Sequence, residues 1–479
     1  MVLARRTFEA ADQARFAQLT GDHNPMHMDA VAARRTQAGA PVAHGMHVVL
    51  WALDELIRSG TLQGPIGALK VQFQKFTFVG APAELRVVRQ SERGLVVAVD
   101  CAGVPALTMT VSADHRGHDG SEALSLNSVT ADQCAVFGLE DLEGHHGLLP
   151  ELDAAAFSGD FPALAAMVGP QAVRSLAQLS ALVGMVCPGL HSIFAGLAIR
   201  LQPSDPSARV SFRVKTVDDR FRMTEMAVAG GGLSGTITAF IRHPPIEQPV
   251  MSQLAGLVSG DEFRGTTALV VGGSRGLGSV TARLLALGGA RVILTWLNGE
   301  AEALSLAEEI NEHVGEARCA AVRYDALNLP EPQLAALPWA PNQLYYFATG
   351  RIFRQKSALY QPEDFADFAR VYVDGFQAVC AALHARMGAL TAFYPSSVAV
   401  EEHPRDMVEY SMAKAAGEML CADLNRFQKG MRVVVNRLPR ILTDQTATVA
   451  TVASRDPVEV MLPIVREMHA ARAGGQPAP

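Results

Sequence analysis

The chain has 479 residues, which is enough for two to four domains. Hydrophobic residues make up 49% and charged residues 19%, which is typical of a globular protein with ample core. The formal net charge of −7 argues against nucleic acid as a partner. No run of about 18 apolar residues occurs and the N-terminus lacks the apolar core of a signal peptide, so we expect a cytoplasmic protein that does not cross a membrane.

The cysteines give no sign of a metal site. None forms a C-x-x-C pair, and none stands at metal-ligand spacing with histidines. They are predicted to be reduced core thiols. The six positions are Cys101, Cys134, Cys187, Cys319, Cys380 and Cys421.

The most informative stretch is FAQLTGDHNPMHMDAVAA, residues 16–33. Gly21 lets the backbone turn sharply, the Asn-Pro pair that follows favours an extended or turn conformation, and Asp29 can cap a helix at the next residue. Asp22 and His27 are therefore expected close together in a rigid turn. Such a pair can hold one water molecule, take its proton and return a proton to the neighbouring carbon of a substrate.

This run resembles the signature of the MaoC-like, R-specific enoyl-thioester hydratases, [ST]-G-D-x-N-P-x-H-x-D, preceded by an aromatic residue and followed by alanine. The resemblance implies a hot-dog fold in which Asp22 and His27 are the catalytic pair and Asn24 supports them. The alternative is a turn with an Asx-type hydrogen bond and a surface histidine. We prefer the catalytic interpretation because every position of the signature is present.

A second segment, PVAHGM at residues 41–46, leads into an apolar helix predicted from Val48 to Ile57. In the family that the chain resembles, this is the long helix that the sheet wraps around. The resemblance implies that the backbone N–H near Gly45, at the helix start, polarises the thioester carbonyl and stabilises an enolate-like oxyanion. We expect His44 to be structural rather than a third catalytic group.

Strands are predicted after this helix, the first at residues 68–78, where apolar and polar residues alternate. Three further segments have strand character: Glu84 to Arg89, Leu95 to Cys101 and Ala106 to Ala113. One helix wrapped by an antiparallel sheet is the hot-dog pattern, so residues 1–118 are predicted as the first domain, its fold ending near His115. Residues 116–129 are polar and contain Gly and Ser, which predicts a linker.

The order and spacing of these segments recur after the linker. An apolar helix is predicted at residues 172–185. Four segments with strand character follow it, at residues 192–201, 208–214, 221–229 and 233–242. Residues 130–248 are therefore predicted as a second, degenerate hot-dog domain, because D-x-N-P-x-H has no counterpart there. It would supply shape, an interface and part of the acyl tunnel, and His191 would carry no chemistry. The alternative is an unrelated α+β domain.

The third predicted domain, residues 262–470, opens with a short apolar strand at Thr267 to Val271, a glycine loop and a helix. This order suits a dinucleotide site, because glycines let the backbone approach the pyrophosphate at the helix N-terminus. The candidate cofactor-binding residues of the loop are Gly272, Ser274, Arg275, Gly276, Leu277 and Gly278. Four more strands alternate with helices, at 291–295, 319–324, 344–347 and 390–394, which predicts a Rossmann-type, doubly wound parallel sheet.

A Y-x-x-x-K spacing places Tyr410 and Lys414 on one face of a predicted helix, one turn apart. A nearby ammonium lowers the pKa of a phenol, which could then donate a proton to a carbonyl. Residues 267–444 thereby resemble the short-chain dehydrogenase/reductase family. The resemblance implies that Ser397 orients the substrate carbonyl, Tyr410 is the acid/base, Lys414 binds the ribose and Asp325 contacts the adenine.

The chain departs from that family in several places. Phe347-Ala-Thr-Gly350 occupies the place of the family's N-N-A-G motif. The position of the family's catalytic Asn lies near Tyr372 in this chain, and Arg440 replaces the glycine of the family's Pro-Gly pair. The family's last strand is missing as well. We therefore expect nucleotide binding, with or without turnover.

The cofactor is expected to be NADP(H) rather than NAD(H). About 20 residues past the glycines, where an acid would bind the ribose of NAD, the chain has Trp296, Leu297 and Asn298. Arg275 in the glycine loop is expected beside the 2′-phosphate.

Together these motifs predict a bifunctional enzyme. It would reduce a 3-oxoacyl thioester with NADPH to the (R)-3-hydroxyacyl thioester and dehydrate this reversibly to the trans-2-enoyl thioester. The carrier would be coenzyme A or acyl carrier protein, and a homodimer is expected. Four residues are candidate phosphate contacts or a solvated basic face: Arg34, Arg35, Lys70 and Lys75. The alternatives are a hydratase whose reductase-like domain only binds nucleotide, and a non-catalytic acyl-thioester scaffold.

Overall fold

The computed structural model describes residues 2–91, 94–113, 127–202, 209–354, 359–446 and 452–473. The described chain forms two compact units, the first ending at Pro244 and the second beginning at Pro245. The predicted division of the first unit into two domains stays a prediction. The predicted linker at residues 116–129 lies outside the described residues except for its last three.

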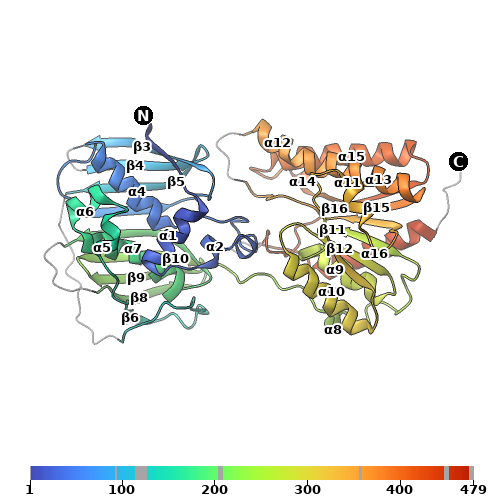
Figure 1. Cartoon of the computed structure of the whole chain (residues 1–479), viewed down its shortest axis with the longest axis horizontal. Coiled ribbons are helices and arrows are strands. Elements are labelled where there is room, and N and C mark those ends of the chain that lie inside the picture. The colour runs from blue at the N-terminus through green and yellow to red at the C-terminus, as the bar shows by residue number, and fades with distance from the viewer. Residues whose placement is uncertain are drawn as a thin grey trace. The chain divides into compact units, whose positions relative to one another are not determined.

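The first unit contains one ten-stranded antiparallel sheet (Figure 1). In spatial order its strands are β1 (Val2–Thr7), β3 (Pro82–Ser91), β4 (Gly94–Cys101), β5 (Val104–Ser112), β2 (Ala68–Phe73), β7 (Ser192–Leu201), β10 (Leu233–Ile241), β9 (Met223–Gly230), β8 (Ser211–Asp218) and β6 (His146–Leu148). Read outward from the central pair β2–β7, the two halves have the same order. One half has the order β2, β5, β4, β3 and β1, and the other half has the order β7, β10, β9, β8 and β6. The last strand of each half is an edge strand of the sheet.

Each half of this sheet carries one long apolar helix, and both helices belong to one hydrophobic core. They are α4 (Gly45–Arg58) and α7 (Pro170–Ala181), the latter extended by the π-helical turn η1 (Leu182–Val186). Both are buried on most of their surface, which explains their nearly continuous apolar sequence. Shorter helices surround them: α1 (Ala10–Thr20), α2 (Pro25–Met28), α3 (Ala30–Ala33), α5 (Ala155–Ser158) and α6 (Pro162–Val168).

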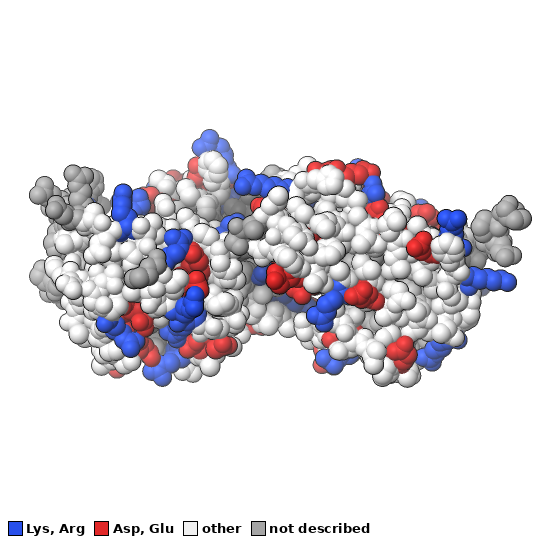
Figure 2. Space-filling view, turned by 90° about the horizontal axis from the view of Figure 1, so that it is seen from above, with Lys and Arg blue, Asp and Glu red and all other residues white. Residues whose placement is uncertain are grey.

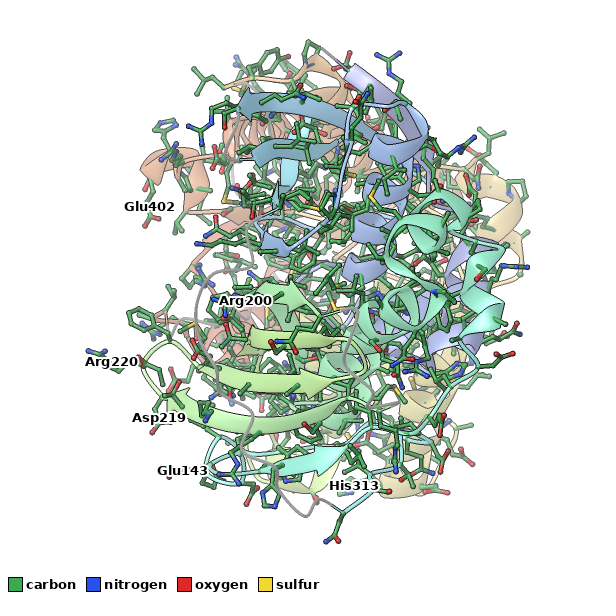
Figure 3. All side chains as sticks on the ribbon, turned by 90° about the vertical axis from the view of Figure 1, so that its left-hand side faces the viewer. Glu143, Arg200, Asp219, Arg220, His313 and Glu402 are labelled. Carbon is green, nitrogen blue, oxygen red and sulfur yellow. The ribbon has the colours of Figure 1, made fainter. Side chains whose placement is uncertain are left out.

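The two edge strands, β1 and β6, were not predicted. β1 pairs with β3 over five residue pairs, and its Arg5 Nε donates to Glu84 Oε1 over 2.7 Å. β6 has only three residues and pairs with β8. Pairing with a neighbouring strand stabilises both edge strands, and neither has an alternating sequence pattern that would predict it. At the next turn, between β8 and β9, Asp219 and Arg220 project away from the sheet (Figure 3).

The second unit is built on a six-stranded parallel sheet with the order β13 (Cys319–Arg323), β12 (Arg291–Trp296), β11 (Thr267–Val271), β14 (Gln343–Tyr346), β15 (Leu390–Ser397) and β16 (Met431–Leu438). The predicted strands at 267–271, 291–295, 319–324, 344–347 and 390–394 are confirmed, with ends shifted by a few residues. The chain builds one side of the sheet from β11 and then returns to build the other. The carboxyl ends of β11 and β14 therefore border the switch point, where ligands of such sheets bind.

Helices cover both faces of this sheet. Ala268 and Val270 pack with α9, α10 and α16, whereas Leu269 and Val271 pack with α13 and α15 on the opposite face. The unit's helical elements are α8 (Met251–Leu254), α9 (Gly276–Leu287), α10 (Glu300–Val314), α11 (Pro330–Ala335), α12 (Pro362–Ala369), η2 (Arg370–Gly375), α13 (Phe376–Met387), α14 (Ala399–Glu402), α15 (Val408–Phe427) and α16 (Pro457–Ala473). This two-faced burial accounts for the continuous apolar character of β11.

Positive and negative side chains are interspersed on the face shown in Figure 2, with no extended area of one sign. Within the described part of the chain, no helix combines the length and apolar character that crossing a bilayer requires.

His47, on α4, is a buried core histidine. Its ring stacks on Phe16 with centroids 4.7 Å apart, and its Nδ1 has no hydrogen-bond partner among the described residues. Burial lowers the pKa of His47 from 6.5 to about 3. Below pH 6.5 the unfolded chain binds a proton here and the folded chain does not, so the free energy of unfolding falls as the pH falls towards 3.

We expect His47 to make the first unit acid-sensitive. Between pH 7 and pH 5 this residue should reduce the free energy of unfolding by about 2 kcal/mol. The variant His47→Phe keeps an aromatic ring and should lose that part of the pH dependence, as measured by urea unfolding at both pH values. Other buried histidines titrate equally in both proteins, so the difference isolates His47. Equal pH dependence in wild type and variant would contradict the prediction.

Candidate active site

A cavity of about 80 Å³ in the first unit collects the candidate hydratase residues. Asp22, Asn24, His27 and Gly45 line it from the N-terminal half. The second half contributes Ser180, Val183, Gly184, Ser192, Ile193 and Phe194. The cavity therefore lies where the two halves of the ten-stranded sheet meet.

Local hydrogen bonds fix the loop that carries the predicted pair. Gly21 ends α1 in the left-handed conformation with φ of 78°. The side chain of Asn24 accepts from Met26 N over 3.0 Å and so caps α2. The carboxylate of Asp29 accepts from the first amides of α3, as the sequence predicts. These caps hold Asp22 and His27 on either side of the Asn-Pro turn.

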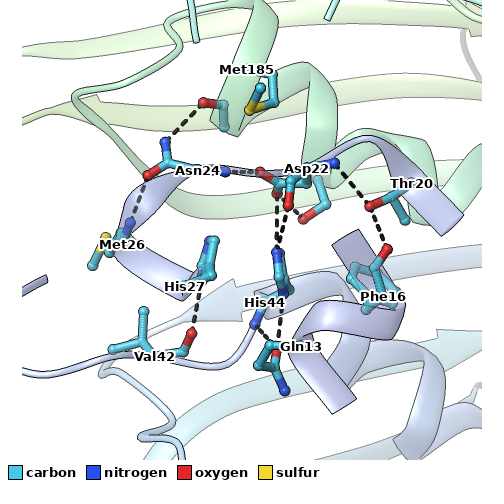
Figure 4. A network of polar contacts seen from close by, with 12 residues as sticks. Gln13, Phe16, Thr20, Asp22, Asn24, Met26, His27, Val42, His44 and Met185 are labelled. Atoms are coloured by element: carbon cyan, nitrogen blue, oxygen red, sulfur yellow. Dashed lines mark hydrogen bonds and ion pairs between the residues drawn. The ribbon is translucent and has the colours of Figure 1, made fainter. Parts of the chain in front are cut away.

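Asp22 is only 1% exposed. It lies in a network of polar contacts with neighbouring side chains and backbone groups (Figure 4). Ser180 Oγ donates to Asp22 Oδ2 over 2.6 Å, and Asn24 N donates to Asp22 Oδ1 over 3.3 Å. Burial raises the pKa of Asp22, while the charge of His27 and these two hydrogen bonds act in the opposite direction. The outcome is a carboxylate more basic than a solvated one, yet provided with donors.

Asn24 docks the loop onto the second half. Its Nδ2 donates to Gly184 O over 2.8 Å and to Leu190 O over 3.4 Å. A Cβ on Gly184 would stand 2.5 Å from Asp22 Oδ1, so only glycine fits there. Neither Ser180 nor Gly184 was predicted from the sequence. The only sequence feature that distinguishes them is that Ser180 is polar and Gly184 is small within an otherwise apolar helix.

His27 presents one ring nitrogen to the cavity. Its Nδ1 lies 2.8 Å from Val42 O, which can only accept, so Nδ1 carries the hydrogen and Nε2 is left for the substrate. The ligand atoms of Asp22, His27 and His44 all lie within 4.8 Å of one another. One water molecule can therefore touch both Asp22 and His27.

His44 is fully buried and tied on both sides. Its Nδ1 lies 2.8 Å from Gln13 Oε1 and its Nε2 lies 3.0 Å from Asp22 O. Its ring stacks on His27 with centroids 3.9 Å apart. Burial and neighbouring histidines hold the pKa of His44 well below 6.5. Both ring nitrogens are engaged by oxygen atoms, so the trio suits proton transfer and loop support better than metal binding.

Gly45 opens α4 at the cavity wall, where the first helical amides point away from the helix. A Cβ at Gly45 would lie 2.9 Å from the ring of Phe73, so a larger residue would push that ring. Among the basic residues named as phosphate contacts, Lys75 lines the cavity, whereas Arg34, Arg35 and Lys70 do not.

The glycine loop between β11 and α9 has a backbone that only glycine allows, of the kind that could hold a pyrophosphate. Gly272 and Gly276 have φ of 75° and 54°. A Cβ on Gly278 would lie 2.3 Å from Gly272 O, so the turn is as tight as only glycine allows. Ser274 lies within the turn, and Leu277 packs against the core from the first turn of α9. The N-terminus of α9 therefore lies directly after this loop.

Two cofactor candidates already have protein partners. Arg275 Nη1 forms an ion pair with Asp444 Oδ2 over 3.1 Å. The carboxylate of Asp325 accepts from Leu327 N over 2.9 Å and from Asn328 Nδ2 over 2.8 Å. Neither pairing was predicted, because Asp444 is distant in sequence and the Asp325 turn is local and polar.

The structure brings Ser397, Tyr410 and Lys414 together at the carboxyl end of β15. Ser397 is hydrogen-bonded to Tyr410, and Lys414 Nζ donates to Pro395 O over 2.6 Å. The expectation that Lys414 lowers the pKa of Tyr410 is wrong. Burial raises the pKa of Tyr410, partly offset by Ser397, and lowers the pKa of Lys414 to about 7.

Tyr372, near the position where the family has Asn, lies in η2 and is 1% exposed. Its ring lies 3.9 Å from Lys414 Nζ, and its hydroxyl lies 2.5 Å from Thr349 Oγ1. The rings of Phe368 and Tyr372 also pack against Tyr410. The Tyr410–Lys414 pair is thus enclosed by aromatic side chains, with a cation–π contact where an amide was expected.

Solved structures similar to this chain match it over less than half its length. A short chain dehydrogenase from Shigella flexneri is 21% identical, covers 44% of this chain and 88% of its own, and gives a TM-score of 0.39. A candidate short chain dehydrogenase from Escherichia coli CFT073, in complex with NADPH, is 22% identical over 44% of this chain and 93% of its own, with a TM-score of 0.39. At these values the likeness carries no argument about what this chain binds.

A dehydrogenase/reductase from Sinorhizobium meliloti 1021 is 23% identical over 43% of this chain and 88% of its own, with a TM-score of 0.37. No curated protein matches the chain. The match that bears on the cavity is at the N-terminal end, which contains the Asp22–His27 loop and α4. Residues 2–100 match the family model of the MaoC like domain.

Proposed function

We propose that the chain is a bifunctional acyl-thioester enzyme, with a double hot-dog hydratase in the first unit and a Rossmann-type short-chain reductase in the second. The observation that carries the proposal is the cavity in which Asp22 and His27 face one another beside the α4 N-terminus. The match of residues 2–100 to the MaoC like domain supports the hydratase half. The repeated strand order supports the double hot dog.

Hydration at this site uses one water held between the two side chains. Asp22 takes a proton from the water as the water oxygen bonds to C3 of the enoyl thioester, while His27 Nε2, which carries no hydrogen, accepts a hydrogen bond from the water's other hydrogen. The proton on Asp22 then passes to C2, and the carboxylate is restored. Ser180 and Asn24 keep the Asp22 carboxylate aimed at the water. The amides at Gly45 stabilise the negative charge that develops on the thioester oxygen. Dehydration is the reverse.

In the second unit, Ser397 and Tyr410 would hold the oxygen of a 3-oxoacyl thioester, and Tyr410 would donate a proton to it. The loop from Gly272 to Gly278 would hold the pyrophosphate of NADP(H), and Lys414 its ribose. When bound, the nicotinamide supplies the hydride for the carbonyl carbon.

The two activities share an intermediate, the (R)-3-hydroxyacyl thioester, so tethering them would raise its local concentration. The carrier would be coenzyme A or acyl carrier protein, and Lys75 in the cavity lining is a candidate phosphate contact. We infer a cytoplasmic homodimer. One observation favours a second candidate: the aromatic enclosure of Tyr410 and Lys414 fits a reductase-like unit that binds nucleotide without turnover.

Removing either member of the predicted pair should slow hydration strongly. In Asp22→Asn and His27→Ala, crotonyl-CoA hydration should fall by about 10²–10⁴-fold, the usual scale for positioned acid–base groups. The measurement is loss of the enoyl absorbance, with His191→Ala as a control that keeps wild-type turnover. Unchanged rates in both variants would remove the hydratase assignment.

Ser180 should matter although it lies in the half without the motif. Ser180→Ala removes a donor to a buried carboxylate, so hydration should fall about tenfold or more. Because this hydrogen bond lowers the pKa of Asp22, its loss should move the acidic limb of the kcat/KM profile to higher pH. Ser175→Ala, buried on the same helix, is the matched control. An unshifted profile in Ser180→Ala would argue against the role.

The two sites should act in series. Acetoacetyl-CoA with NADPH should yield crotonyl-CoA with the wild type and no product with Tyr410→Phe, while Asp22→Asn should accumulate the R alcohol. Chiral chromatography of the products tests this. Accumulation of the S alcohol in Asp22→Asn would contradict the prediction that the two sites act in series. Nucleotide binding without NADPH oxidation for any 3-oxoacyl thioester would favour the second candidate.

A further inference from the structure

The loop that follows β16 lies beside the glycine loop. A Cβ on Gly276 would lie 3.8 Å from Thr443 Cγ2, which places the two segments in contact distance. The loop is tied to itself, because Thr443 N donates to Thr446 Oγ1 over 2.9 Å and Thr446 Oγ1 donates to Thr443 O over 3.1 Å. These bonds close the turn that contains the neighbouring Asp444.

Asp444 contacts both an arginine side chain and a backbone amide. Its Oδ2 pairs with Arg275 Nη1 over 3.1 Å, and its Oδ1 accepts from Ile246 N over 2.8 Å. The side chain of Asp444 is 8% exposed and that of Arg275 is 26% exposed. An ion pair this shielded is screened less by salt than a surface pair. Arg275 is thus neutralised within the loop where a 2′-phosphate was expected to meet it.

A 2′-phosphate carries about −1.5 to −2 charges near neutral pH. To reach Arg275 it must approach the Asp444 carboxylate, and like charges at such distances repel. NADH, which lacks this phosphate, meets no such repulsion. The ion pair therefore acts selectively against one of the two dinucleotides.

We propose that Asp444 is a specificity-determining residue of the nucleotide site: it competes with the 2′-phosphate for Arg275 and so limits the preference for NADPH over NADH. This inference rests on the proposed function of the second unit. It adds that the preference is set by a pair of residues, Arg275 and Asp444, rather than by Arg275 alone.

The test is nucleotide binding to the full chain, measured by fluorescence titration of NADPH and of NADH. Asp444→Asn removes the charge but keeps an oxygen that can accept from Ile246 N. It should raise the ratio of NADPH to NADH affinity about tenfold, the scale of one charge-assisted contact. Asp444→Ser serves if the first variant does not fold. The double variant Asp444→Asn with Arg275→Met should lose the gain.

The matched control is Glu262→Gln, since Glu262 also pairs with an arginine, Arg466, over 2.6 Å and accepts from a backbone amide, Ser259 N. It should leave the ratio unchanged. An unchanged ratio in both Asp444 variants would overturn the inference while leaving nucleotide binding intact. If the wild type and all variants bind neither dinucleotide, the proposed function of the second unit fails instead.

Discussion

The candidate hydratase site depends on one contact, the docking of the Asp22–Asn24 loop onto α7 and η1. Ser180 reaches Asp22 and Gly184 receives Asn24 across sequence separations of 158 and 160 residues. The β2–β7 pairing at the centre of the ten-stranded sheet brings these segments together. A half that lacks the catalytic motif is therefore still part of the site, because without it Asp22 would lose its strongest donor.

That contact also decides what kind of acid–base group Asp22 becomes. Burying a carboxylate is costly unless donors compensate for the lost water. Here Ser180 and the amide of Asn24 supply donors, while the remaining burial keeps the pKa above its ordinary value. The same contacts hold the Asp22–Asn24 loop in place at the cavity. Basicity and positioning thus come from one arrangement.

The parts that sequence predicted are those determined locally. The turn at Gly21, the cap at Asp29 and the bounds of β11 follow from residues within a few positions of one another. What it missed is non-local: the short edge strands, the contribution of Ser180, and the ion pair between Arg275 and Asp444. A single serine in an apolar helix has no pattern that distinguishes a site residue from a packing residue.

Burial disfavours the charged groups of both candidate sites, but the two sites differ in what offsets this effect. In the first unit, the charged form of Asp22 has hydrogen-bond donors in place before any substrate arrives. In the second unit, aromatic rings surround Lys414, and burial disfavours both its ammonium form and the phenolate of Tyr410. Proton transfer there needs polarity that bound molecules must bring. The Asp22 carboxylate therefore has its hydrogen-bond donors in the folded chain, whereas the polarity of the second site depends on bound molecules, so nucleotide binding and turnover are to be measured separately in the second unit.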